Sequence, residues 1–448
     1  MQNLHRVIES FFKLKDLNTN IRTEVMAGVT TFMAMAYIIF VNPAMISQTG
    51  IDFGAAMVAT SISAAVATIL MGLYANYPIA LATGMGENAF FTYTVCMTMG
   101  ISWPVALGCV FMEGVLFLFL TLIKLRQKII DAIPASLRYG TACGIGFLIA
   151  FIGLMDAGLI VSHPATFVTL GDILSPAAML SIVGLIVTSV FLIKKIKGGI
   201  LWGILSTALL GIFCGIIKYQ GFVSLPPSLA PTFLKMDIAG ALKLGFLSII
   251  FIFLFMDIFD TVGTLAGIGE LGGFMRQGKL PRAGRAMFSD AVGTCVGAAC
   301  GTPTVTSYIE SAAGIATGGR SGLASVVTGL LFFASLFFFP LVKMIGGGYV
   351  SPQGALLHPV TAPALIIVGS MMLHSITKID WQDYSESIPA FLVMLMMPLT
   401  FSIATGIAMG FISYAALKLF TGRGKQVSWL VYILAALFIL RFVYLKAM

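Results

Sequence analysis

Residues 255–264 read FMDIFDTVGT and lie inside an apolar run that extends from about residue 244 to residue 268. Asp257 and Asp260 are three positions apart, so on a helix they project from one face. A run of this length and composition is typical of a helix that spans a bilayer. A charged side chain in the middle of such a helix costs roughly 2.5–3.5 kcal/mol or more. The stretch therefore predicts a membrane helix on a transport pathway, with Asp260 as its principal acid and Asp257 either functional or bonded to a neighbouring helix.

The rest of the chain has the composition of a membrane protein. Its 448 residues are 58% hydrophobic and only 10% charged, and the mean hydropathy is +1.00, whereas a soluble domain carries about 25% charged residues. The long apolar runs do not alternate with polar residues, so they predict an all-α, multi-pass integral membrane protein. The net charge of +8 fits basic cytoplasmic loops and does not indicate nucleic-acid binding.

No pattern for an enzyme, a metal site or a disulfide framework is present in the sequence. The six cysteines lie in or beside apolar runs and show no ligand spacing with histidine. A Ser/His/Asp set, a zinc-ligand pattern and a phosphate-binding glycine loop are absent as well. We therefore expect no cofactor and no enzymatic activity.

Apolar segments number about fourteen, at roughly 25–46, 54–74, 82–99, 104–123, 140–161, 176–193, 199–217, 244–268, 288–301, 303–317, 322–344, 360–376, 388–418 and 428–446. The third and tenth are short and rich in Gly, Thr, Ser and Asn. They predict discontinuous helices, which are stable only where protein or a cavity covers the broken backbone.

Basic clusters indicate which ends of the segments are cytoplasmic. They lie at residues 5–22, 124–138, 194–197 and 276–285, and all four fall inside if the N-terminus is inside. Residues 388–418 can be one long span or a broken pair of helices, and the two alternatives place Arg423 on opposite sides.

An internal repeat is visible at an offset of 225 residues. Gly72 and Pro78 flank the turn before the third segment, and Gly297 and Pro303 flank the turn before the tenth. We expect a cytoplasmic segment at 1–22, a first seven-segment repeat at 23–225 and a second at 235–448. An odd number of spans in each copy makes the two copies inverted.

A second acid lies in residues 301–314, which read GTPTVTSYIESAAG. Thr302–Pro303 predicts extended chain leading into a short helix, with Glu310 about two turns into that helix. Such a helix start offers free backbone donors to a ligand. Glu310 is read as a site residue, or alternatively as a structural acid bonded across the bundle.

The matching stretch of the first copy, residues 82–91, reads ATGMGENAFF. Phe90 and Phe91 could stack on a flat ligand or simply pack in the core. Glu87 is a further acid, either within the membrane or solvated near a helix end.

The offset of 225 also pairs the acids with apolar positions. Met35 corresponds to Asp260 and Met85 to Glu310, which predicts an acidic wall from the second copy and an apolar wall from the first. Elsewhere, Glu113 is expected to bond within the bundle. Trp381, Asp383 and Glu386 are predicted to lie in a cytoplasmic loop.

Together these stretches resemble the AzgA-like purine permeases of the nucleobase/cation symporter-2 class. The motifs that carry the resemblance are AGVTTFMAMAYI at 27–38, GMG and NAFF within 84–91, residues 257–264 and 306–314, and GGRSGL at 318–323. The resemblance covers essentially the whole chain. It implies fourteen transmembrane segments in two inverted repeats, located in the cell (inner) membrane. Segments one to four and eight to eleven would form a core domain, and the others a gate domain.

The resemblance also implies proton-coupled uptake of a purine base such as adenine, guanine or hypoxanthine. Ligand would bind between segments three and ten, against segments one and eight. The implied substrate-binding residues are Asp260, Glu310, Phe90, Phe91, Asn88, Gly84, Thr31 and Thr306. The implied proton-coupling residues are Asp260, Glu310, Asp257 and Thr264.

Two departures from the family pattern bear on these expectations. The chain has Thr83 and Glu87 where members usually have Pro and Leu, which affects the geometry of segment three. Thr264 stands where related uracil carriers have a histidine, so any proton relay must differ. The expected partners are a purine base, a proton (or Na⁺) and the lipid bilayer, with a homodimer as a possible assembly; a sulfate-type anion carrier of the same fold and a channel are the alternative functions.

Overall fold

Helices make up most of the computed structural model, which describes residues 2–123, 134–243, 247–275, 280–352 and 354–444. In this described part, eight helices are long and apolar enough to cross a membrane, and three more are apolar but shorter. This confirms the prediction of a mostly helical membrane protein. The basic clusters at 124–138 and 276–285 lie partly outside the described residues.

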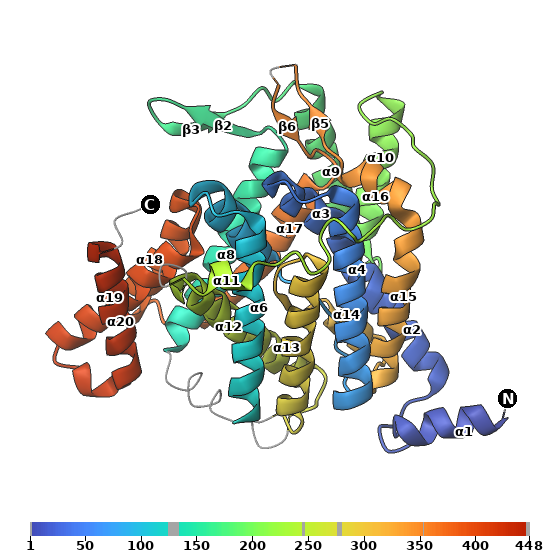
Figure 1. The fold of residues 1–448 in the computed structure, drawn as a ribbon, viewed down its shortest axis with the longest axis horizontal. Helices are drawn as coiled ribbons and strands as arrows, with labels where there is room; N and C mark the ends of the chain where they lie inside the picture. Colours follow the sequence, from blue (N-terminus) through green and yellow to red (C-terminus); the bar gives the residue numbers. More distant parts are fainter. Residues whose placement is uncertain (1, 124–133, 244–246, 276–279, 353, 445–448) are drawn as a thin grey trace.

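One group of helices, drawn from the first part of each half of the chain, contains or flanks the predicted site residues. Within it, α13 packs on α4 and α6, while α15 packs on α2 and α4 (Figure 1). Its members are α2 (Ile21–Met35), α3 (Ile38–Ile46), α4 (Phe53–Leu70), α5 (Met85–Ala89), α6 (Trp103–Leu122), α12 (Leu247–Leu271), α13 (Ala283–Cys300), α14 (Ser311–Ala316), α15 (Gly322–Ser335) and α16 (Phe339–Gly346). We call this group the core helices.

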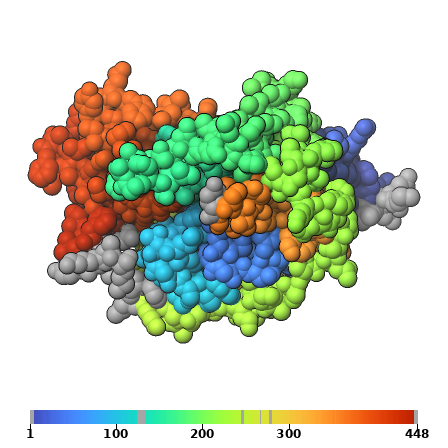
Figure 2. Space-filling view, turned by 90° about the horizontal axis from the view of Figure 1, so that it is seen from above, coloured from blue at the N-terminus to red at the C-terminus, as the bar shows by residue number. Residues whose placement is uncertain are grey.

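A second group, which we call the gate helices, combines the later helices of each half. Within it, α8 packs on α17 and α18, α18 packs on α19, and α9 packs on α10. Its members are α8 (Ala135–Asp156), α9 (Pro176–Ile193), α10 (Gly199–Phe213), α17 (Ala362–Met372), α18 (Tyr384–Thr400), α19 (Ile403–Phe420) and α20 (Trp429–Tyr444). Seen from above, the C-terminal helices form one end of the molecule, in red (Figure 2).

Short elements complete the chain. Helix α1 (Gln2–Phe11) lies at the N-terminus and α11 (Ile238–Ala241) packs on α6. Two hairpins, β2–β3 (Ile160–His163, Phe167–Leu170) and β5–β6 (Tyr349–Val350, Leu356–Leu357), lie at the top of Figure 1. The remaining strands, β1 (Leu81–Thr83) and β4 (Val305–Ser307), come from opposite halves of the chain and pair with each other.

The segment at 388–418 is a broken pair of helices, which decides between the two alternatives left by the sequence. Helix α18 ends where Phe401 adopts a left-handed backbone with φ of 49°. Ser402 then caps α19 by accepting a hydrogen bond from the amide of Thr405. A non-glycine residue at positive φ is uncommon and stops the helix there.

The loop prediction holds for Trp381 and Asp383 but is wrong for Glu386. Asp383 is the N-cap of α18, and Glu386 lies in the first turn of that helix. Hydrogen bonds from the hydroxyl and amide of Ser385, with Arg423 beside them, hold the pKa of the exposed Asp383 carboxyl below its usual range. Acidic residues near a helix start are common because they satisfy free amides and suit the helix dipole, and the sequence around them is too polar to show the helix by its periodicity.

Candidate functional site

The β1–β4 pair is the frame of the site. The two strands are antiparallel, with Ala82 opposite Thr306. The ladder continues past the strands, because the Gly84 amide donates to the Thr304 carbonyl (2.9 Å) and the Tyr308 amide donates to the Ala80 carbonyl (3.0 Å). The third and tenth segments are thus extended first and helical only afterwards, which confirms their discontinuous character.

Each strand is held by a threonine of the preceding helix. The Thr68 hydroxyl of α4 donates to the Leu81 carbonyl (2.8 Å) and accepts from the Leu81 amide (2.9 Å). The Thr294 hydroxyl of α13 makes the same two bonds with Val305, both at 3.1 Å. These bonds satisfy backbone groups that would otherwise be unpaired in a buried, non-helical segment.

Asp260 lies half-buried on α12, beside this frame. The side chain of Thr306, from β4, makes a hydrogen bond with its carboxylate. Thr264, one turn further along α12, is also half-buried. The structure therefore brings a strand residue, Thr306, to Asp260, which sequence spacing along the helix does not reveal.

Asp257 is directed into the bundle instead. It is fully buried, and the hydroxyl of Thr261 lies 3.2 Å from its Oδ1 and 2.6 Å from Oδ2 of Asp290 on α13. Ser307 of β4 also donates to Asp290, at 3.3 Å. Asp290 was not identified from the sequence, although an acid inside the apolar run of α13 is a signal of a functional position.

Glu310 immediately precedes α14, as its N-cap residue. The prediction that it lies two turns inside the helix is wrong, because strand pairing keeps residues 305–307 extended and delays the helix start. The hydroxyl of Tyr37, in the break between α2 and α3, donates to Glu310 Oε1 at 2.7 Å. A hydrogen bond to a carboxylate is stronger than one between neutral groups.

Two tyrosines lie near the acids, and neither was identified from the sequence. Tyr308 donates to the Thr83 carbonyl at 2.5 Å, and its ring centroid is 6.4 Å from that of Tyr37. Tyr37 and Tyr308 both interact electrostatically with Asp260 and with Glu310. A tyrosine in an apolar helix is usually interpreted as a packing residue, so only the fold shows that these two hydroxyls lie at the candidate site.

The aromatic residues of segment three lie inside the bundle. Phe90 and Phe91 are fully buried. The ring of Phe90 packs edge-on against Phe253 of α12, with centroids 4.9 Å apart. Nearby, the Asn88 side-chain amide donates to the Thr83 hydroxyl at 3.3 Å.

Thr31 and Gly84 mark two close approaches of the chain. Thr31 of α2 is buried against α14, and its hydroxyl would lie only 2.1 Å from a Cβ added at Gly314. Gly84 caps α5, and a Cβ there would lie 2.2 Å from Oε2 of Glu87. Both glycines allow the discontinuous segments to pack against their neighbours.

Glu87 is buried, with 1% of its surface exposed, which excludes the alternative of a solvated position near the helix end. Glu113, in contrast, bonds within the bundle as expected, because it accepts from the Thr304 hydroxyl at 3.5 Å. Both residues belong to the first half of the chain. The first half is therefore not a purely apolar wall.

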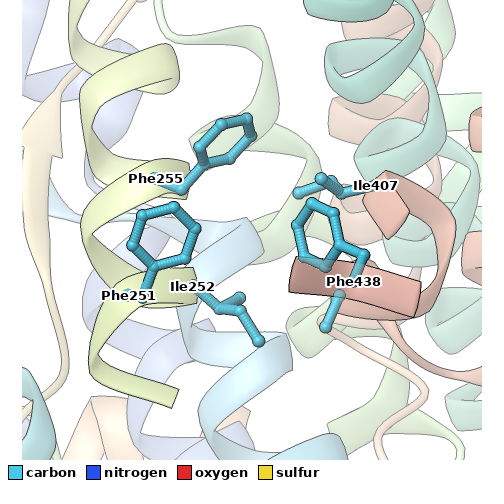
Figure 3. Close-up of a pocket in the computed structure, with 6 residues that line it drawn as sticks. Phe251, Ile252, Phe255, Ile407 and Phe438 are labelled. Carbon is cyan, nitrogen blue, oxygen red and sulfur yellow. The ribbon is translucent and has the colours of Figure 1, made fainter. Parts of the chain in front are cut away.

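An apolar gap separates the core helix α12 from the gate helices α19 and α20. Figure 3 shows Phe251, Ile252 and Phe255 on one side and Ile407 and Phe438 on the other. No polar side chain lines this gap. It is a packing boundary between the two groups of helices and not the place where a polar base would bind.

Comparison with known proteins places the chain among transport proteins. The chain is 42% identical to the adenine permease AdeP of Escherichia coli over 98% of its length and 97% of that protein's. It is 43% identical to the guanine/hypoxanthine permease PbuG of Bacillus subtilis, over 98% of this chain and 100% of the other.

Solved structures agree on the fold. The transmembrane domain of the cyanobacterial bicarbonate transporter BicA matches with a TM-score of 0.60 at 14% identity, over 87% of this chain and 96% of that domain. The SLC26A9 structure matches with a TM-score of 0.61 at 11% identity, over 93% of this chain and 69% of the other.

The sequence profile of the Permease family matches residues 22–409, which is most of the chain. The relatives are those expected from the resemblance to AzgA-like purine permeases. The chain is therefore a multi-pass membrane transport protein that belongs to the Permease family.

Proposed function

We propose that this protein carries purine nucleobases (adenine, guanine or hypoxanthine) into the cell together with protons, by alternating access. The names of its relatives, an adenine permease and a guanine/hypoxanthine permease at 42–43% identity, support the substrate class. Uptake across the cell membrane fits the family and the fold.

The observation that carries the proposal is the presence of two half-buried acids beside one strand frame. Asp260 and Glu310 interact electrostatically with each other and face the hydroxyls of Thr306 and Tyr37. A neutral planar base presents N–H donors and ring acceptors along its edge. Carboxylates accept such donors, and hydroxyls can donate or accept.

Proton coupling follows from the cost of charge in the membrane. A carboxylate at this depth costs several kcal/mol, so the loaded carrier crosses more easily once the acid is neutral. Asp260 and Glu310 are the proposed proton carriers, with Asp257 and Thr264 as the neighbours expected to assist. We expect Asp260→Asn to abolish purine uptake driven by a pH gradient, and persistence of that uptake would exclude Asp260 as the proton site.

We further propose that the chain contains fourteen transmembrane segments in two inverted repeats, at 23–225 and 235–448. The paired strands support this, because β1 and β4 occupy equivalent places in the two halves. The threonine bonds support it too: Thr294 follows Thr68 by 226 positions, and their strand partners Leu81 and Val305 are 224 apart. Core and gate helices then correspond to the moving and scaffold parts of an alternating-access carrier.

The test is uptake by purified protein in liposomes. Radiolabelled adenine, guanine and hypoxanthine would be offered with an imposed pH gradient, and uracil, sulfate and bicarbonate would be used as competitors. We expect saturable counterflow of a purine that depends on pH and resists sulfate and bicarbonate. Transport of sulfate or bicarbonate in place of purines would favour the anion carriers that share the fold, and flux without saturation would favour a channel.

A further inference from the structure

Glu87 is an acid without a hydrogen-bond partner in the middle of the protein. It lies in the first turn of α5, and neither of its carboxyl oxygens has a hydrogen-bond partner among the described residues. Other buried acids of the bundle accept hydrogen bonds from threonine hydroxyls: Thr304 donates to Glu113, and Thr261 lies between Asp257 and Asp290. A buried carboxylate that lacks partners is strongly unfavourable, so Glu87 must be neutralised.

The groups that face Glu87 are themselves acidic or neutral. Its carboxyl group interacts with Asp260 of α12, Glu113 of α6 and Asp290 of α13. Tyr308, between β4 and α14, interacts with it as well. No basic side chain is among these neighbours, so a small cation must supply the neutralising charge.

A proton suits this position better than a metal cation. Hard cations require six or so oxygen ligands at short range, and no group of three or more acidic, histidine or cysteine side chains in the described residues is arranged to hold a metal ion. The carboxyl group of Glu87 instead lies against the backbone of Gly84, near the methyl group of Thr306. A proton needs only the carboxyl oxygen itself.

Thr306 links Glu87 to the transport site. Its methyl group is on the side of Gly84 and Glu87, and its side chain also makes a hydrogen bond with Asp260. Two carboxylates that both border Thr306 repel each other when both are ionised, so their protonation is coupled. Loading a base on Asp260 excludes water from the pair and favours protonation of both groups.

We propose that Glu87 binds a second proton in each transport cycle, in addition to the proton carried at Asp260 or Glu310. An O–H bond forms at Glu87 on the side where proton and purine load, and it breaks on the side where both are released. This inference rests on the proposed function, because it assigns one more coupled proton to the same carrier. A purine accumulation ratio is multiplied by about ten for each pH unit and each coupled proton.

The experiment measures the number of protons that move with each purine. Purified protein in liposomes would be poised with opposing pH and purine gradients until net flux of labelled purine is zero. The number of protons moved per purine would be compared in the unaltered protein and in Glu87→Gln, which keeps the shape of the side chain but cannot titrate. We expect the substitution to lower this number by one, and so to lower purine accumulation about tenfold per pH unit. Purine binding should be retained.

Two further variants complete the design. Glu87→Asp keeps a titratable group and should restore the higher ratio, whereas Glu270→Gln removes an exposed acid at the end of α12 and should leave it unchanged. If the ratio of Glu87→Gln equals that of the unaltered protein, Glu87 is permanently protonated and the inference fails. A ratio that depends on Na⁺ at constant pH would overturn it as well.

Failure of the inference can be told from failure of the proposed function. If the unaltered protein moves no purine, or moves it without regard to pH, the proposed function fails. If the unaltered protein is coupled to protons and only the effect of Glu87→Gln is missing, the proposed function stands without the second proton.

Discussion

Tyr37 shows how a single hydroxyl can position the carboxylate of Glu310. It lies in the short break between α2 and α3 and donates to Glu310 from the opposite half of the chain. This bond fixes one carboxyl oxygen of Glu310 and leaves the other available. The orientation of the proposed binding acid therefore depends on a residue 273 positions away in the sequence.

Removing that hydroxyl should weaken purine binding. A hydrogen bond to a charged group contributes about 1.5–3 kcal/mol, so Tyr37→Phe should raise the purine concentration for half-maximal uptake by at least about tenfold. Concentration-dependent uptake in liposomes would measure the change. Tyr219→Phe, at an exposed tyrosine, is the matched control, and equal kinetics in the two variants would show that Tyr37 does not position the site.

Elements are held in place by side-chain bonds to non-helical backbone. β1 and β4 have only three residues each, so two strands of this length cannot be stable alone. Thr68 and Thr294 tie them to α4 and α13 by two hydrogen bonds each. The site frame thus depends on the helices that flank it.

Thr294→Val should loosen this frame while leaving the volume of the side chain nearly unchanged. The substitution leaves the amide and carbonyl of Val305 without a partner, which costs about 2 kcal/mol. Thermal unfolding of the detergent-solubilised protein would detect the loss. The control is Thr141→Val, at a buried threonine of α8 whose hydroxyl donates to the Leu137 carbonyl of its own helix, and it should have a much smaller effect. A similar loss of stability at both sites would mean that the bonds between Thr294 and Val305 add no particular stability.

The gate helices have an ion pair of their own. The ammonium group of Lys418, on α19, is buried and lies 2.7 Å from Oε1 of Glu386 on α18. Tyr414 donates to the same oxygen at 3.0 Å, and Ser136 of α8 donates to Oε2. Three gate helices therefore meet at one carboxylate.

Lys418→Met should destabilise the gate helices, because it leaves Glu386 without its cation. Breaking a buried pair costs about 3–5 kcal/mol, and we expect the lower end because part of Glu386 reaches solvent. Combining it with Glu386→Gln should recover a substantial part of the lost thermal stability. Additive losses in the double variant would argue against a direct pairing.

At the scale of the whole molecule, the proposed alternating access requires the core and gate helices to move past each other. Phe255 of α12 and Phe411 of α19 meet across this boundary, with ring centroids 5.5 Å apart, next to the apolar gap of Figure 3. These contacts are apolar, so no directional hydrogen bond among them fixes one relative position of the core and gate helices. Such a surface permits sliding at low cost.

Cross-linking would test this motion. In a background without the six native cysteines, a bifunctional thiol reagent joining Phe255→Cys to Phe411→Cys should stop purine uptake. Joining Phe32→Cys to Phe332→Cys, whose rings are 5.2 Å apart within the core helices, should leave uptake intact. Uptake that survives the first cross-link would rule out movement at this boundary.

The sequence by itself indicated that the protein lies in a lipid bilayer, that its segments are helical, and which acids are the principal candidates. Apolar composition leaves only a membrane environment, and the rarity of intramembrane charge singles out Asp257, Asp260 and Glu310. The composition of the third and tenth segments, rich in Gly, predicted that their helices are discontinuous, because broken backbone needs small and polar residues. These signals are local, so they can be read along the chain.

Only the tertiary structure decided which groups meet. Tyr37, Tyr308 and Asp290 look like ordinary residues of apolar segments until strand pairing brings the two halves together. The same pairing moved the start of α14 beyond Glu310, and packing buried Glu87 where a solvated end had been an alternative. Hydrogen bonds over more than 200 positions carry no periodicity in the sequence, so contacts of this kind follow from the fold alone.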